Sequence, residues 1–128
     1  MVVVGRSTLV GLPIFHLLLN RHATVTICHE NTHNLDEITS KADIVVSAVG
    51  KANLINHLKQ NSVAIDIGIS RNAEGKLCGD IGSDAKKECS LATPVPRGVG
   101  PLTVAMLMEN TVKLWRKQMK IVRNSVER

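Results

Sequence analysis

Aromatic residues are almost absent from this chain of 128 residues. Phe15 and Trp115 are the only two, and there is no tyrosine. Proteins that hold single-stranded nucleic acid stack bases on rows of aromatic side chains, so this kind of binding is not expected. No run approaches the roughly 20 apolar residues that a membrane-spanning helix needs, and residues 1–6 reach a charge too early for a secretion signal. We expect a soluble, cytoplasmic protein.

Cysteine, glycine and proline are also sparse. The three cysteines, Cys28, Cys78 and Cys89, cannot all pair within the chain and form no C-x-x-C motif, which predicts reduced thiols in an intracellular protein. Nine glycines, four prolines and 44% hydrophobic residues exclude a collagen-like or disordered chain. The length allows one packed domain of ordinary size.

The positive charge is confined to the C-terminus. Residues 1–112 are balanced, with ten basic and ten acidic side chains, whereas residues 113–128 hold six basic residues against Glu127. We therefore divide the chain into a domain over 1–112 and a basic helical extension over 113–128. Cations at the C-terminal end of an exposed helix face the negative end of its dipole. This explanation is favoured over nucleic-acid binding by the extension.

Short apolar runs alternate with longer segments of helical character. Unbroken Val, Ile and Ala runs are typical of strands covered on both faces of a parallel sheet. The expected strands are 2–4, 23–28, 43–48, 63–67 and 90–93, and the expected helices are 10–21, 34–40, 53–61, 83–89 and 103–123. A turn at 72–75 predicts a short additional strand or loop at 76–79. This order predicts a single α/β domain with a doubly wound, mostly parallel, Rossmann-like sheet and helices on both faces.

The last expected helix carries apolar residues at steps of three and four, from Val104 to Val122. This spacing is typical of a helix that lays one face on a core. Its final two turns gather the charge, so we expect that part to leave the core or to meet a partner.

The turn after the first strand is a candidate phosphate site. Gly5 permits a tight turn, Gly11 lets the following helix approach the sheet, and helix N–H groups can hold a phosphate. Ser7 stands where a G-x-G-x-x-G motif has its second glycine, and the sequence does not fit a P-loop. The planar guanidinium of Arg6 suits a phosphate. A plain strand-to-helix turn is the alternative.

Glu30 follows the second strand, where dinucleotide-binding folds carry an acid for the ribose hydroxyls of NAD. Arg6 favours NADP instead, and a simple ion pair between the two side chains is a third possibility. Cys28, His29 and His33 are too few for a zinc site, so no metal is expected.

A loop rich in proline and glycine precedes the last helix. It includes Pro96, Arg97, Gly98, Val99 and Gly100 within the segment TPVPRGVGPLT at 93–103. Such a stiff loop is typical of a segment that shapes a binding site. The alternative is a rigid connector between strand and helix.

In this combination the sequence resembles the cofactor-binding half of the methylenetetrahydrofolate dehydrogenase/cyclohydrolase family. The resemblance runs from residue 2 to about residue 112. The matching residues are 2–7; Val10, Gly11 and Pro13; 23–26 with Cys28 and His29; 42–46 with Gly50; 65–69 with Arg71; Gly79 and Asp80; and 93–96 with 98–101 and Thr103.

The resemblance implies an NAD(P)-binding domain. Gly5, Arg6 and Ser7 would hold the phosphates of NADP or NAD, Glu30 would meet the adenine ribose, and Ile69 would lie beside the nicotinamide. The loop from Pro96 to Gly100 would line the folate side. The family transfers hydride from 5,10-methylenetetrahydrofolate to the nicotinamide, and many members then hydrolyse the methenyl product. Members usually form homodimers.

Three departures from the family pattern limit this expectation. The family's acid–base lysine and its tyrosine partner belong to an N-terminal folate domain, so we expect no catalytic residue in this chain and no activity from it alone. Position 30 is Glu where NADP-using members commonly have Ser, which favours NAD. Arg97 replaces a glycine, and at positive φ it would cost about 1 kcal/mol. The alternative function is a non-catalytic scaffold or regulatory module that retains the fold.

Overall fold

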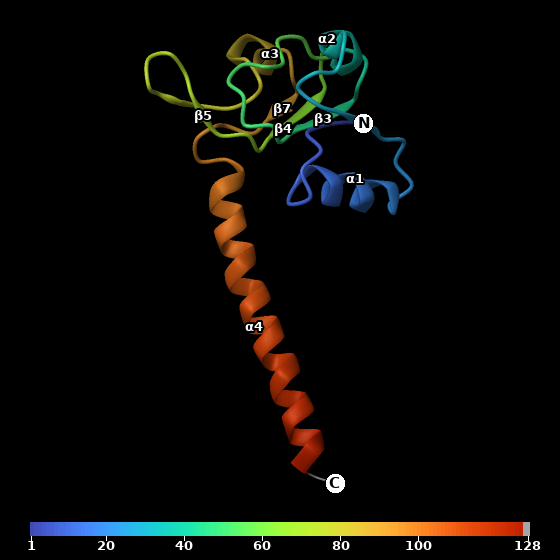
Figure 1. The fold of residues 1–128 in the computed structure, drawn as a ribbon, viewed down its shortest axis with the longest axis vertical. Helices are drawn as coiled ribbons and strands as arrows, with labels where there is room; N and C mark the ends of the chain where they lie inside the picture. Colours follow the sequence, from blue (N-terminus) through green and yellow to red (C-terminus); the bar gives the residue numbers. More distant parts are fainter. Residues whose placement is uncertain (127–128) are drawn as a thin grey trace.

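The computed structural model, which describes the backbone of residues 1–126 and the side chains of residues 1–120, contains a parallel sheet with one long helix leaving it (Figure 1). Five parallel strands are hydrogen-bonded in the order β2-β1-β3-β4-β7. They are β1 (Val2–Val4), β2 (Thr26–Cys28), β3 (Ile44–Ser47), β4 (Val63–Asp66) and β7 (Leu91–Ala92). The predicted doubly wound α/β fold is confirmed.

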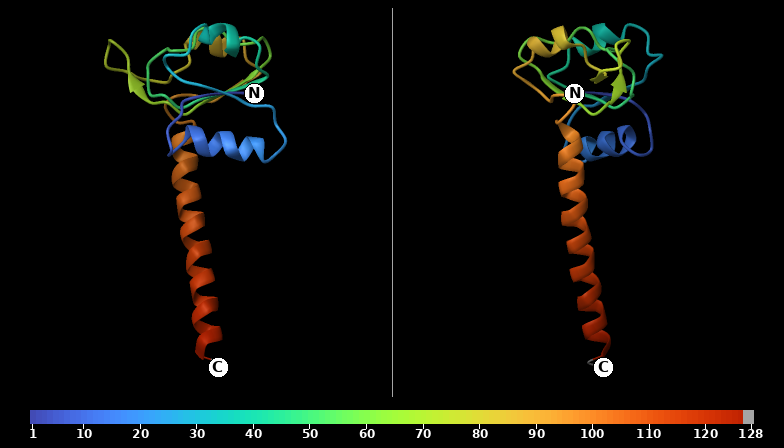
Figure 2. Two further views of the ribbon diagram at one scale, coloured as in Figure 1. Left: turned by 45° about the vertical axis from the view of Figure 1, so that its right-hand side comes forward. Right: turned by 90° about the vertical axis from the view of Figure 1, so that its left-hand side faces the viewer.

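Helices cover both faces of this sheet. The helix α1 (Gly11–Leu19) lies on one face, while α2 (Leu35–Thr39) and α3 (Ser83–Lys87) lie together on the other (Figures 1 and 2). The interior strand β1 is buried along its whole length, as the unbroken valine run predicts. Chain order and helix placement together give the crossover pattern of a doubly wound sheet.

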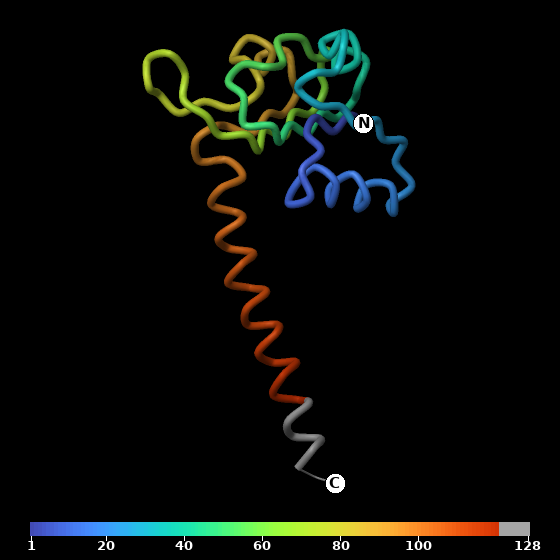
Figure 3. The backbone as a smooth tube through the Cα atoms, in the orientation of Figure 1, coloured from blue at the N-terminus to red at the C-terminus, as the bar shows by residue number. Residues whose placement is uncertain are grey.

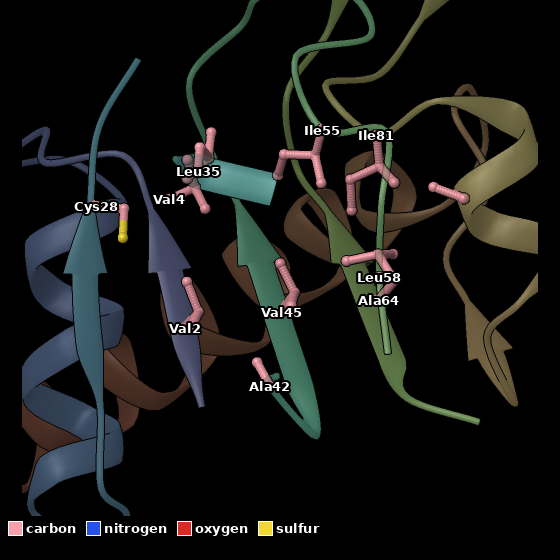
Figure 4. Packing of buried hydrophobic residues seen from close by; sticks show 11 residues of the cluster. Val2, Val4, Cys28, Leu35, Ala42, Val45, Ile55, Leu58, Ala64 and Ile81 are labelled. Atoms are coloured by element: carbon pink, nitrogen blue, oxygen red, sulfur yellow. The ribbon is translucent and has the colours of Figure 1, made fainter. Parts of the chain in front are cut away.

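The main hydrophobic core fills the space between the sheet and the layer of α2 and α3 (Figure 4). Val2, Val4 and Val45 point into it from the central strands, and Ile55 and Ile81 meet them from the segments above. All five side chains are buried, at 4% exposure or less. Burial at this level stabilises each side chain by roughly 1.5–3 kcal/mol.

A small antiparallel ribbon stands beside the sheet. It pairs β5 (Ser70–Arg71) with β6 (Leu77–Cys78). The connecting turn is closed by the Asn72 side chain, whose Oδ1 accepts the backbone N–H groups of Glu74 and Lys76. The predicted turn and short strand are thus confirmed.

The helix predicted over 53–61 is wrong. This segment is extended, and Ile55 pairs with Ile81 in an isolated parallel bridge. Its N–H donates to the Asp80 carbonyl, and its own carbonyl accepts from the Gly82 N–H. Asn53 and Asn61 adopt positive φ angles of 50° and 60°, a conformation that interrupts a right-handed helix. Pairing with residues 80–82 therefore replaces the helical hydrogen bonds.

The final helix, α4 (Val99–Val126), begins four residues earlier than predicted and projects away from the sheet (Figures 2 and 3). Every side chain from 101 to 120 is exposed, including Leu107, Met108 and Trp115 at 64%, 65% and 59%. The expectation that its apolar face packs on the core is therefore wrong. Hydrophobic spacing reports that a helix has an apolar face, whereas what covers that face depends on the tertiary arrangement. The division at 112/113 stays a prediction.

Gly11 permits close contact between α1 and the turn after β1. A Cβ at this position would overlap the Gly5 carbonyl, which is backbone and has no rotamer to change. We expect Gly11→Ala to lower the free energy of unfolding by about 1–3 kcal/mol, as measured by urea denaturation.

Gly100→Ala is the matched control, because a Cβ there meets no atom within 4 Å. Alanine is favoured over glycine in a helix by roughly 0.5–1 kcal/mol, so this variant should be neutral or slightly more stable. Equal losses in the two variants would contradict the packing role of Gly11.

Candidate functional site

The candidate site lies at the carboxyl ends of the parallel strands. β1 has β2 as one neighbour and β3 as the other, so the chain winds in opposite directions from this point. Open α/β sheets bind ligands in the crevice at such a switch point. The predicted residues Gly5, Glu30 and Ile69 all follow strands at this edge.

The turn after β1 is held by close backbone contacts. Gly5 has φ 124°, and its N–H donates to the Cys28 carbonyl at 2.8 Å. A Cβ on Gly5 would lie 2.6 Å from the carbonyl oxygen of Ala48. Only glycine therefore fits between the two neighbouring loops.

Arg6 and Ser7 are exposed at this turn. The Ser7 Oγ accepts the backbone N–H of Val10 at 3.2 Å, and the Gly11 N–H lies 3.5 Å away. Ser7 therefore orders the first turn of α1, while its neighbour Arg6 extends a cation beside it. The guanidinium of Arg6 suits a bound anion. The first N–H groups of α1 are already used within the turn, because Val10 and Gly11 face the Ser7 Oγ and Leu12 donates to the Ser7 carbonyl.

Glu30 is exposed two residues after β2. Among the ion pairs found for residues 1–120, none joins it to Arg6. The structure thus gives no support to the alternative in which these two side chains neutralise each other. Both charges remain available to a ligand.

The cysteine and histidines beside Glu30 have local partners. The His29 Nδ1 accepts the backbone N–H of Asn31 at 3.2 Å. Burial raises the pKa of the Cys28 thiol, against a smaller lowering by its hydrogen bond with Thr32. Within the described part of the chain, no three His, Cys, Asp or Glu side chains are grouped as metal ligands.

The loop rich in proline and glycine forms the opposite wall of the site. Together with Ile69 it lines a cavity of about 220 Å³, whose other lining residues are Asp66, Ile67 and the run 94–100. A Cβ on Gly98 would overlap the Pro94 carbonyl, so the loop is folded tightly on itself. Arg97 adopts φ 73°. The sequence analysis gave only the cost of a positive φ at this arginine, and the structure shows that this cost applies.

Two buried carboxylates hold these loops, and the sequence analysis missed both as site residues. Asp66 ends β4 and Asp80 follows β6, and their exposed fractions are 1% and 0%. Each carboxylate lies directly against a glycine of the other segment: a Cβ on Gly68 would overlap Asp80, and a Cβ on Gly79 would overlap Asp66. The two segments are therefore interlocked through their glycines.

Asp66 connects three segments of the site. Its carboxylate accepts the backbone N–H groups of Asp80 and Ile81 at 3.0 and 3.2 Å and forms an ion pair with Lys86 at 2.7 Å. The same ammonium donates to the Thr93 carbonyl at 3.3 Å, and the Thr93 Oγ1 accepts the N–H of Asp66 at 2.7 Å. Thr93 begins the proline and glycine loop, so Asp66 fixes where that wall starts.

One sequence signal identifies these carboxylates. An acid within an apolar strand run, as in IDIGI at 65–69, costs free energy unless it is hydrogen-bonded in the interior. A second acid directly after Gly79 has the same character. Burial of such residues implies an organised polar network, although their partners are distant in sequence.

The fold and the crevice together define a dinucleotide-binding domain of the doubly wound α/β class. The chain belongs to the family described as tetrahydrofolate dehydrogenase/cyclohydrolase, NAD(P)-binding domain, which it matches over residues 1–119. This confirms the resemblance drawn from the sequence.

Relatives in sequence carry the name bifunctional protein FolD. The protein of Bacillus velezensis is 56% identical over 119 residues, which cover 91% of this chain and 42% of the relative. That of Bacillus subtilis is 56% identical over 115 residues, covering 88% and 41%. The chain therefore spans about two-fifths of the length of the curated relatives it matches.

Solved structures show the same arrangement. The bifunctional FolD enzyme of Campylobacter jejuni has a TM-score of 0.86 at 42% identity, over 91% of this chain and 43% of that one. The Trypanosoma brucei methylenetetrahydrofolate dehydrogenase-cyclohydrolase, complexed with NADP cofactor and inhibitor, has a TM-score of 0.86 at 39% identity, over 92% and 43%. Among the described helices, none is long and apolar enough to cross a membrane.

Lys86 is the only cation found paired with Asp66 in the described residues. Removing one partner of a buried ion pair leaves an uncompensated charge, so Lys86→Ala should lower the free energy of unfolding by about 3–5 kcal/mol. Its neighbour Lys87 pairs with the exposed Asp84. Lys87→Ala should leave the urea midpoint nearly unchanged, since exposed pairs contribute little. Comparable losses in both variants would refute the role of Lys86.

Proposed function

We propose that this chain is the cofactor-binding half of a methylenetetrahydrofolate dehydrogenase/cyclohydrolase. The observation that carries the proposal is the placement of two walls on one edge of the sheet: the Gly5 turn, open to an anion, and the proline and glycine loop. The loops that follow β3 and β4 connect them, with Ala48 against Gly5 and Gly50 beside Ile69. Membership of the NAD(P)-binding family supports NAD or NADP as the ligand.

The residues of the first wall fit a dinucleotide. Gly5 removes the Cβ that would meet Ala48, and the exposed Arg6 offers a guanidinium at the same turn. We propose that Gly5, Arg6 and Ser7 hold the pyrophosphate, that Glu30 meets the adenine ribose, and that Ile69 lies at the nicotinamide end. The bound cofactor would supply a ring that accepts hydride.

The second wall fits the folate substrate. Its cavity is shaped by stiff backbone and apolar side chains, with Ile69 as the residue shared between the two ligands. We propose that Pro96, Arg97, Gly98, Val99 and Gly100 form the substrate side. Arg97 adds a cation there, whose guanidinium is exposed.

The chemistry needs a partner domain. Proton transfer requires a group within hydrogen-bonding reach of the reacting atoms, and we propose no catalytic residue among those of this chain. We propose that a folate domain shares the substrate with this one, as the greater length of the relatives suggests. A homodimer is proposed as the assembly, and the cytoplasm as the compartment, supported by three free thiols.

The full chain should bind NAD⁺ or NADP⁺ without added substrate. A ligand that binds only the native state stabilises it by about 2.7 kcal/mol at a hundredfold excess over Kd, so the melting temperature should rise with cofactor concentration. Arg6→Ala should reduce this rise, whereas Arg21→Ala, at the far end of α1, should not. A melting temperature that neither cofactor changes would favour the non-catalytic scaffold.

Glu30 is expected to select against NADP⁺. An exposed carboxylate near a 2′-phosphate costs roughly 1 kcal/mol, so Glu30→Ser should raise the affinity for NADP⁺ about fivefold and leave NAD⁺ binding unchanged or weaker. Calorimetric titration measures both constants. Glu74→Ser, in the exposed turn between β5 and β6, is the control. Wild-type protein that binds NADP⁺ more tightly than NAD⁺ would contradict this assignment.

A further inference from the structure

The Asp80 carboxylate is surrounded by donors of one loop. It accepts the hydroxyl of Ser47 at 2.8 Å and the backbone N–H groups of Val49, Gly50 and Lys51 at 2.7, 2.9 and 2.8 Å. The ion pairs found for residues 1–120 include none at Asp80. Dipoles of the loop after β3 therefore stabilise this buried charge, and in return the charge orients the loop.

This orientation decides which groups the loop presents to a ligand. In a planar trans peptide the C=O points opposite to the N–H. Because three successive N–H groups point at Asp80, the carbonyls of Ala48, Val49 and Gly50 point away from it. The Ala48 oxygen, which faces Gly5, shows this directly. Beyond Ala48, whose oxygen lies against Gly5, the loop thus presents the Val49 and Gly50 carbonyls, which suit hydroxyl and amide donors.

The loop lies on the nicotinamide side of the crevice. At one end Ala48 lies against Gly5, and at the other Gly50 lies beside Ile69, whose carbonyl oxygen would be 3.9 Å from a Cβ on that glycine. Glu30 and β2 lie on the opposite side of β1. With the pyrophosphate at Gly5, the adenosine half extends toward β2 and the other half along this loop. That half carries ribose hydroxyls and a carboxamide NH₂, both of which are donors.

We propose that Asp80 is a positioning residue for the nicotinamide riboside: its carboxylate turns the carbonyls of Val49 and Gly50 toward the hydroxyl and carboxamide donors of that half of the cofactor. The proposal rests on the function proposed above. It assigns a role in cofactor binding to a side chain that lies beneath the loop.

The role requires aspartate. Gly68 already lies against the carboxylate, so the extra methylene of glutamate has no space. Asparagine keeps the size but places an NH₂ group among N–H donors, where it has no acceptor. The Asp66 carboxylate accepts the Asp80 N–H and thereby fixes the Asp80 backbone. The carboxylate is thereby fixed in position under the loop.

The test compares two ligands on the full-length chain. ADP contains the adenosine and pyrophosphate but lacks the nicotinamide riboside, so its affinity reports on the fold and the Gly5 turn. Hydrogen bonds to a charged group carry energies that convert to about a tenfold to hundredfold change in binding. We expect Asp80→Asn to weaken NAD⁺ binding by a factor of about 10 to 100. The affinity for ADP should change by less than about twofold.

Two further variants accompany Asp80→Asn. Ser47→Ala removes one donor and keeps the carboxylate, so a smaller, severalfold loss for NAD⁺ alone is expected. Asp84→Asn, on the exposed surface of α3, should change neither constant. Amide hydrogen exchange should become faster at Val49–Lys51 in Asp80→Asn and remain slow in the strands. A general loss of structure would instead make exchange faster in the strands as well.

The outcomes are distinguishable. Equal losses for ADP and NAD⁺ in Asp80→Asn, or unchanged binding of both, would overturn the positioning role and leave the proposed function intact. If Asp80→Asn does not fold, Ser47→Ala decides by the same comparison, and an unchanged NAD⁺ affinity overturns the role. Wild-type protein that binds neither ligand would instead refute the proposed function and this role with it.

Discussion

The site depends on two buried carboxylates that lock two distant segments together. Asp66 lies against Gly79, and Asp80 lies against Gly68. Each segment therefore supplies one carboxylate and one glycine, and the glycine leaves room for the carboxylate of the other segment. The two aspartates are fourteen residues apart and are separated by the antiparallel ribbon. Because of this contact, the loops after β3 and β4 and the start of the proline and glycine wall share one anchor.

Stability alone is a weak explanation for such an anchor. Burying two carboxylates with one ammonium carries a desolvation cost that the Lys86 ion pair does not clearly exceed. The remaining compensation comes from backbone N–H groups, which must be held in one geometry to satisfy both acids. Apolar side chains would fill this interior without that requirement. What the carboxylates add is orientation, because each accepted N–H fixes a peptide plane at the edge of the crevice.

The parts that the sequence predicts are those governed by local pattern. The first and last residues of β1 are those that its valine run predicts. An unbroken apolar run marks both ends of a strand that is buried on both faces. The segment around Ile55 shows the opposite case, since its hydrogen-bond partners Asp80 and Gly82 lie twenty-five and twenty-seven residues away and override helical character. Gly5 and Glu30 are candidates because each follows an expected strand, whereas Ile69 is a candidate only through the family resemblance. Asp66 and Asp80 were missed because their role exists only where the two segments meet.

The same network relates the two walls of the crevice to each other. Lys86 contacts Asp66 and the Thr93 carbonyl at once, so the proline and glycine loop begins at a point fixed by the residue that also holds the Asp80 backbone. Arg97 lies four residues beyond that fixed point, at a positive φ that its side chain disfavours. A strained residue persists where the surrounding structure over-determines its conformation. The compact contact of Gly98 with Pro94 and the anchoring at Thr93 supply that constraint, and the Arg97 backbone is consequently fixed among the residues that line the cavity with Ile69.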